Sequence, residues 1–141
     1  MVDDLYTRAM MSWALVFLGG GLGSLLRHAA AEVAQRLPGE PGPGRFPYAT
    51  LAVNVLGCLL IGFAAEWCAD REPARALFVV GILGGFTTFS SFGLDTVRLL
   101  SAGEVGKAVA YVLLTVAAGL FAVWVTYESG FVDAADALRG D

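Results

Sequence analysis

Four uncharged runs constrain this chain more than any other feature of its sequence. They cover residues 9–26, 46–65, 76–94 and 108–127, and none contains Asp, Glu, Lys or Arg. Each is close to the roughly 20 residues that a helix needs to cross the hydrocarbon core of a bilayer. Only 16% of all residues are charged and 57% are hydrophobic, whereas soluble domains carry about 25% charged residues. The sequence therefore predicts an all-α membrane protein with four transmembrane helices.

The residues flanking the runs set the expected helix boundaries. We predict helices over about 12–35, 48–67, 74–100 and 104–127. They would form one transmembrane domain over residues 1–130, followed by a short polar tail over 131–141. The proline-rich stretch 37–47 is expected to be a loop. A cleaved signal peptide is the alternative for the first run, but the acidic start, Asp3 and Asp4, lacks the basic residues of such a peptide. We therefore expect a multi-pass protein of the inner or plasma membrane.

The positive charges are balanced between the two sides of the membrane. Four helices put both termini on one side, side A. The Lys and Arg residues then divide into Arg8, Arg71, Arg75 and Arg139 on side A, and Arg27, Arg36, Arg45, Arg98 and Lys107 on side B. An excess of Lys and Arg on one side sets membrane orientation. The absence of such an excess predicts insertion in both directions and makes an antiparallel, dual-topology homodimer possible. No basic patch with interleaved aromatic residues indicates a nucleic-acid partner, so the expected surroundings are lipid and a second copy.

The stretch 84–92, GGFTTFSSF, weakens the helix expected over the third run. It combines two adjacent glycines with two threonines and two serines, and each Gly costs about 1 kcal/mol against Ala in a helix interior. A helix broken near 84–88 would end in carbonyls of partial negative charge and resume with amides of partial positive charge. A break would thus offer a cation site beside an anion site. The other interpretation is a glycine kink that serves tight packing.

Polar and small residues mark the other helices. Asn54 lies one turn after Thr50, and an Asn at membrane depth must be satisfied, either by another helix or by a ligand. The last helix carries a stripe at intervals of four, Lys107, Tyr111, Thr115 and Gly119. In the first helix, the pairs Gly19/Gly23 and Gly20/Ser24 would let another helix approach closely.

These motifs together resemble the Fluc (CrcB-type) fluoride channel family. The resemblance covers nearly the whole chain, through GGGLGSLLRH, TLAVNVLGCLLIG, GGFTTFSSF and the Tyr111/Thr115 stripe. It implies a fluoride-selective channel that exports fluoride passively. It also implies an antiparallel homodimer with two pores and a structural sodium ion at its centre.

The resemblance also implies roles for individual residues. The backbone carbonyls of Gly84 and Thr87 would bind sodium. The residues implied to line the pore and its polar track are Asn54, Phe89, Phe92, Thr50, Ser90, Ser91, Tyr111 and Thr115. Arg27 and Lys107, at the margins of the runs, would attract anions. The chain departs from the family pattern at Gly119, where a hydroxyl is common, at Ser91, where Thr is usual, and at His28, where Tyr is frequent. The departure at Gly119 bears on how far the polar track extends along the last helix.

Three other functions are weighed against a channel. A small proton-coupled exporter of the multidrug type needs a carboxylate inside the membrane, but the four runs contain none and Asp95 follows the third. In a purely structural membrane protein, the glycines would serve assembly alone. An enzyme is disfavoured because the chain has one His and no evident pairing of a nucleophile with a base.

Overall fold

Four long helices build the described part of the chain. The computed structural model describes residues 2–36 and 44–139, with side chains over 5–36 and 44–128. Within these residues, helices long and apolar enough to cross a membrane cover Leu5–Arg36, Tyr48–Trp67, Glu72–Ser101 and Val105–Glu128. This confirms the prediction of four spans. Part of the predicted loop, 37–43, and the last two residues of the predicted tail lie outside the described residues.

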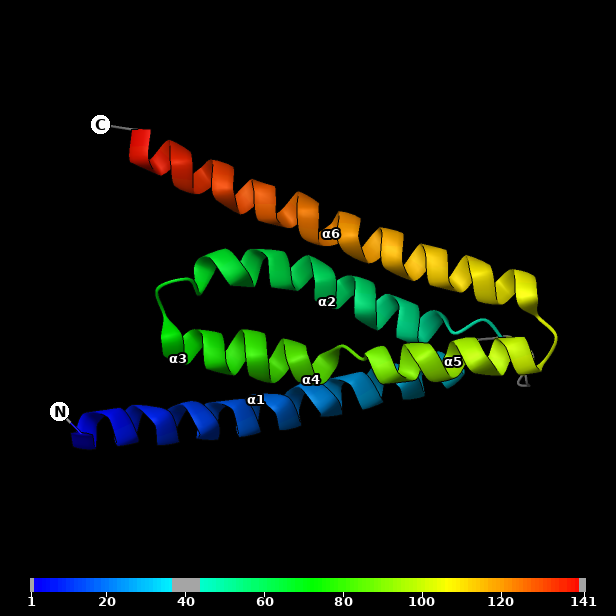
Figure 1. Ribbon diagram of the computed structural model, residues 1–141, viewed down its shortest axis with the longest axis horizontal. Coiled ribbons are helices and arrows are strands. Elements are labelled where there is room, and N and C mark those ends of the chain that lie inside the picture. The colour runs from blue at the N-terminus through cyan, green and yellow to red at the C-terminus, as the bar shows by residue number, and fades with distance from the viewer. Residues whose placement is uncertain (1, 37–43, 140–141) are drawn as a thin grey trace.

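The helices differ from the predicted ranges mainly at their ends. Their bounds are α1 Val2–Arg36, α2 Tyr48–Trp67, α3 Glu72–Ala74, η1 Arg75–Leu83, α4 Gly84–Phe86, α5 Phe89–Ser101 and α6 Val105–Arg139. The helix α2 has the expected range, whereas α1 begins earlier and α6 continues further. Apolar composition marks the part of a helix that lies in lipid, but backbone hydrogen bonding continues beyond it until a residue such as Pro stops it. The start of α1 and the end of α6 lie at the same end of the bundle (Figure 1).

The third span, from α3 to α5, changes its packing partner half-way along. Its first part, η1 and α4, packs on α1, whereas α5 packs on α6, and α2 touches both parts. Within the described residues, α1 and α5 do not pack on each other. The short non-helical link between α4 and α5 therefore moves the span from one neighbour to another (Figure 1). The segment η1 is a π-helix, in which the Gly84 amide donates to the Val79 carbonyl. Such turns are rare and frequent at functional sites.

Small residues let α1 and the third span approach closely. Gly19 and Gly23 are both buried. A Cβ atom on Gly19 would lie 2.5 Å from the Leu77 carbonyl oxygen, and one on Gly23 would overlap the Ile82 carbonyl oxygen. Neither glycine could therefore carry a side chain at this spacing, which confirms the close approach predicted from the Gly19/Gly23 pair.

Replacing Gly23 by Ala should loosen this contact. The added methyl must displace the Ile82 backbone, so we expect a loss of roughly 1–3 kcal/mol, as for other overpacked sites. Gly21→Ala is the matched control, because a Cβ at Gly21 meets nothing within 4 Å. Thermal unfolding of the two purified variants in detergent measures the difference. Equal midpoints would contradict the packing described for Gly23.

Candidate functional site

The interruption in the third span consists of two extended residues. Thr87 has φ −77° and ψ 157°, and Thr88 has φ −152° and ψ 115°. Gly84 keeps a helical backbone, with φ −64° and ψ −36°, and Gly85 also stays in α4. A Cβ on Gly85 would lie 2.5 Å from the Gly20 carbonyl oxygen. Gly85 therefore serves packing on α1, and the threonines form the non-helical link.

Asn54 on α2 satisfies the backbone of the interruption. The Thr88 amide donates to Asn54 Oδ1 at 2.8 Å, and Asn54 Nδ2 donates to the Thr88 carbonyl oxygen at 3.1 Å. Asn54 thus makes a hydrogen bond to another helix, which was one of the two roles predicted for it from the sequence. An amide nitrogen carries two hydrogens, so one remains to donate elsewhere, and a ligand role for Asn54 stays compatible with this geometry.

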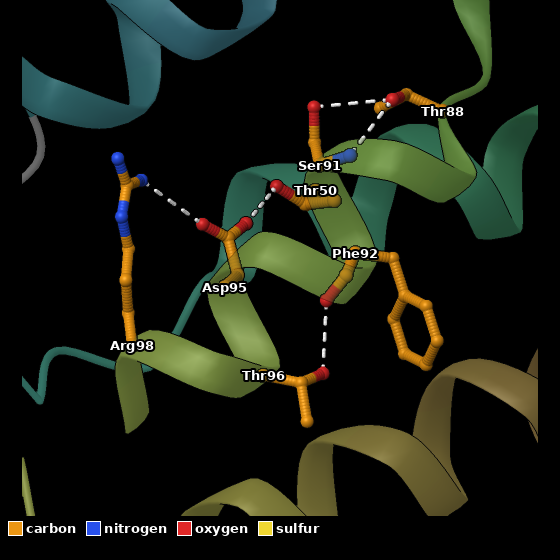
Figure 2. A network of polar contacts seen from close by, with 7 residues as sticks. All are labelled: Thr50, Thr88, Ser91, Phe92, Asp95, Thr96 and Arg98. Atoms are coloured by element: carbon orange, nitrogen blue, oxygen red, sulfur yellow. Dashed lines mark hydrogen bonds and ion pairs between the residues drawn. The ribbon is translucent and has the colours of Figure 1, made fainter. Parts of the chain in front are cut away.

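The Thr88 hydroxyl caps α5. Thr88 Oγ1 accepts from the Ser91 amide at 3.1 Å and donates to Ser91 Oγ at 3.1 Å, as Figure 2 shows. It also lies 3.2 Å from Ser90 Oγ. A threonine at this position satisfies one of the free amides of a helix start. Ser90 and Ser91, both predicted site residues, are thereby gathered around Thr88, which was not predicted.

Two backbone carbonyls lose their helical donors as a result. In an unbroken helix the Thr88 amide would donate to the Gly84 carbonyl, and the Ser91 amide to the Thr87 carbonyl. Here both amides bind side-chain oxygens instead, those of Asn54 and Thr88. Gly84 and Thr87 are the residues whose carbonyls the resemblance assigns to sodium. The side chains that stabilise the interruption are thus the ones that free these oxygens.

A groove of about 370 Å³ runs beside the interruption, between α2, α5 and α6. It is lined by uncharged residues throughout, namely Asn54, Gly57, Cys58, Ile61, Thr87, Thr88, Phe89, Phe92, Thr115, Val116, Gly119, Leu120 and Val123. The ring centroids of Phe89 and Phe92 are 5.5 Å apart, and Phe89 is 84% exposed. The groove is therefore open and uncharged, and it is lined by apolar and aromatic side chains with a few polar ones.

Two buried hydroxyls near these rings have no hydrogen-bond partner within the described part of the chain. Tyr111, whose ring lies 5.3 Å from that of Phe92, is fully buried, and Thr115 is 9% exposed. No hydrogen bond to Tyr111 Oη or Thr115 Oγ1 is found among the described residues. Buried polar groups in native proteins are almost always bonded, so an unpaired one calls for water, an ion or a ligand. Thr115 lines the groove, so its hydroxyl can donate to a ligand there.

A second polar cluster lies further along α5. Thr50 Oγ1 donates to Asp95 Oδ2 at 2.7 Å, and Arg98 Nη1 lies 3.5 Å from Asp95 Oδ1 (Figure 2). Thr50, a predicted site residue, is thus held by a carboxylate outside the groove. Asp95 was not predicted to belong to the site, although its spacing of three from Phe92 places the two residues on neighbouring positions of one helix face.

The two predicted anion-attracting residues differ in their surroundings. Lys107 Nζ lies 3.1 Å from Glu104 Oε1 and donates to the Gly44 carbonyl at 3.2 Å, so its charge is largely offset. No hydrogen bond or ion pair is found for Arg27 on α1 within the described part of the chain. Neither residue lines the groove. Arg27 is therefore the better placed of the two to act on a mobile anion.

A model of a known protein family matches most of the chain. Residues 14–127 match a family model described as CrcB-like protein, Camphor Resistance (CrcB). The chain belongs to the CrcB family. This confirms the resemblance inferred from the motifs and, with the four apolar helices, identifies a multi-pass membrane protein of a prokaryote.

Curated relatives are similar along most of their length. A protein of Thermus thermophilus is 44% identical over 124 residues, which is 86% of this chain and 96% of the relative. One of Rhodopseudomonas palustris is 45% identical over 119 residues, 79% of this chain and 93% of the relative. One of Agrobacterium fabrum is 42% identical, covering 82% of this chain and 92% of the relative. Each carries the name fluoride-specific ion channel FluC.

Removing the Asn54 side-chain amide should destabilise the protein. Asn54→Ala leaves the amide and carbonyl of Thr88 unpaired, which should cost roughly 1–3 kcal/mol for each buried group. Thr96→Val is the matched control, since Thr96 Oγ1 only donates to the Phe92 carbonyl of its own helix. Thermal unfolding in detergent provides the measurement. If Asn54→Ala proved as stable as Thr96→Val, the Thr88 backbone would not depend on Asn54.

Proposed function

We propose that this chain is a fluoride-selective ion channel through which fluoride leaves the cell passively. The observation that carries the proposal is the groove, which combines the unpaired Thr115 hydroxyl and the second Nδ2 hydrogen of Asn54 with aromatic edges and contains no charged side chain. Membership of the CrcB family and relatives named as fluoride-specific channels support it. A channel of this kind needs no catalytic group, and we assign none.

The chemistry of the groove suits a small, strongly hydrated anion. Such an ion gives up water only where donors replace it, and the candidates here are the second Nδ2 hydrogen of Asn54, the Thr115 hydroxyl and the positive ring edges of Phe89 and Phe92. Conduction also requires binding weak enough for release. A Lys or Arg in the groove would hold the ion, so neutral walls favour passage. Arg27, outside the groove, would raise the local anion concentration.

We further propose that the working unit is an antiparallel homodimer. In a single copy the groove would open toward lipid and expose its polar lining, such as the half-buried Asn54, to hydrocarbon, which membrane proteins avoid by burying such groups in protein or in a water-filled cavity. A second copy covering Phe89 would turn each groove into a closed path. The balanced Lys and Arg count supports opposite orientations.

A structural sodium ion fits the interruption. The Gly84 and Thr87 carbonyls lack the amides that would bind them in a helix, and carbonyl oxygens are suitable ligands for a hard cation. When bound, the ion would neutralise the partial negative charge at the end of α4. The hydrogen bonds that Asn54 Oδ1 and Thr88 Oγ1 accept from the Thr88 and Ser91 amides would keep both carbonyls available to it.

Fluoride flux from liposomes tests the function directly. Liposomes loaded with potassium fluoride and purified protein should release fluoride once valinomycin balances the charge. Chloride should leave at the rate of empty vesicles, and fluoride efflux should persist without a pH gradient. Equal chloride and fluoride rates would contradict selectivity. A requirement for a proton gradient would instead favour the small proton-coupled exporter, with Asp95 as its carboxylate.

The two phenylalanines provide a test of the pathway. Phe89→Ile and Phe92→Ile keep an apolar side chain but remove the ring edge, so we expect each to lower fluoride flux about tenfold, as the loss of about 1.4 kcal/mol would. Phe17→Ile is the matched control, because Phe17 is 79% exposed and lies on α1, outside the groove. Normal flux in both groove variants would rule out this pathway even if the protein conducts fluoride.

A further inference from the structure

The polar stripe of α6 lacks a side chain at its fourth position. Tyr111 and Thr115 present hydroxyls, but Gly119, one turn after Thr115, presents only backbone. All the same, Gly119 is buried and lines the groove together with Thr115. Any polar side chain at this level of the groove must therefore come from another helix.

That side chain is the thiol of Cys58 on α2. A Cβ atom built on Gly119 would lie 3.3 Å from Cys58 Sγ, which is tighter than an ordinary van der Waals contact. Cys58 and Gly119 both line the groove. Cys58 also follows Asn54 by one helical turn, so that the two side chains lie on the same face of α2. The thiol thus borders the space that a side chain at position 119 would enter, and it would have to shift slightly to admit one.

The unpaired hydroxyl of Thr115 independently marks this part of the groove as a ligand site. Thr115 is 9% exposed, and its Oγ1 has no partner within the described part of the protein. A group this buried is expected to have a partner, and the groove that Thr115 lines is where one can bind. Cys58 therefore lines the same groove as a buried hydroxyl that has no partner within the described part of the chain.

We propose that the Cys58 thiol is a lining group of the anion pathway, a weak S–H donor in the place of the hydroxyl that Gly119 lacks. The inference rests on the proposed function and names a further residue that contacts the conducted anion. A neutral thiol donates only weakly, which suits a step where the ion must be released quickly. A bulkier side chain at position 119 and the thiol would compete for the same space.

Reciprocal substitution tests this exchange of roles. Cys58→Ala removes the donor and should lower fluoride flux roughly two- to tenfold, as the loss of one weak hydrogen bond would. Cys58→Ala/Gly119→Ser supplies a hydroxyl from the opposite helix and should recover most of the flux. Cys58→Ser should conduct fluoride faster than Cys58→Ala, because serine also supplies a donor. Cys68→Ala is the control, because Cys68 is fully buried outside the groove and its variant should conduct like the unmodified protein.

Thiol modification provides a second measurement. Ethyl methanethiosulfonate should reduce fluoride flux through the unmodified protein, and fluoride should slow the reaction. The reagent should not change fluoride flux through Cys58→Ser. Because that variant still carries Cys68, this result would show that modification of Cys68 does not affect conduction. If Cys58→Ala conducts normally, or the double variant conducts no better than Cys58→Ala, or the reagent has no effect on the unmodified protein, the role of Cys58 is overturned while the channel function stands. If the unmodified protein conducts no fluoride, the proposed function fails, and this role fails with it.

Discussion

The paired hydrogen bonds between Asn54 and the Thr88 backbone are the interaction on which the rest of the site depends. Non-helical backbone at membrane depth leaves an amide and a carbonyl that hydrocarbon cannot satisfy. Asn54 supplies both an acceptor and a donor, at 2.8 and 3.1 Å. Because one side chain on α2 satisfies both groups, the third span can be interrupted without exposing Thr88. The interruption is therefore a stable feature of the bundle.

The interruption gives the third span two different environments. Before it, η1 and α4 pack tightly on α1 through glycines; after it, α5 packs on α6 and brings Phe92 against Tyr111. The carbonyls at the end of α4 and the amides at the start of α5 carry opposite partial charges. In the proposed channel, the carbonyls at the end of α4 hold a cation, and an anion passes beside α5. The neutral groove next to them supplies the donors that such an anion needs.

Much of the fold and part of the site could be predicted from the sequence. The four spans follow from uncharged runs of membrane length, and the close approach of α1 follows from the spacing of Gly19 and Gly23. Several site residues that the resemblance named do gather in one groove, Asn54, Phe89, Phe92 and Thr115 among them. Thr88, Asp95 and Cys58 were not predicted, because their roles depend on which helix lies opposite. The sequence of one helix does not show which other helix packs against it.

By itself, the sequence determined that this chain spans a membrane four times, that each span contains a long uncharged run and that the third span contains a weak point. These properties depend on composition and on short-range propensity, which are local. Only the tertiary structure decided that the threonines form the link and Gly85 packs on α1, that the Gly44 carbonyl accepts a hydrogen bond from Lys107, and that the Cys58 thiol lies beside Gly119. Each of these depends on contact between residues distant in the chain or on backbone hydrogen bonds diverted to side chains, and helical periodicity cannot specify either.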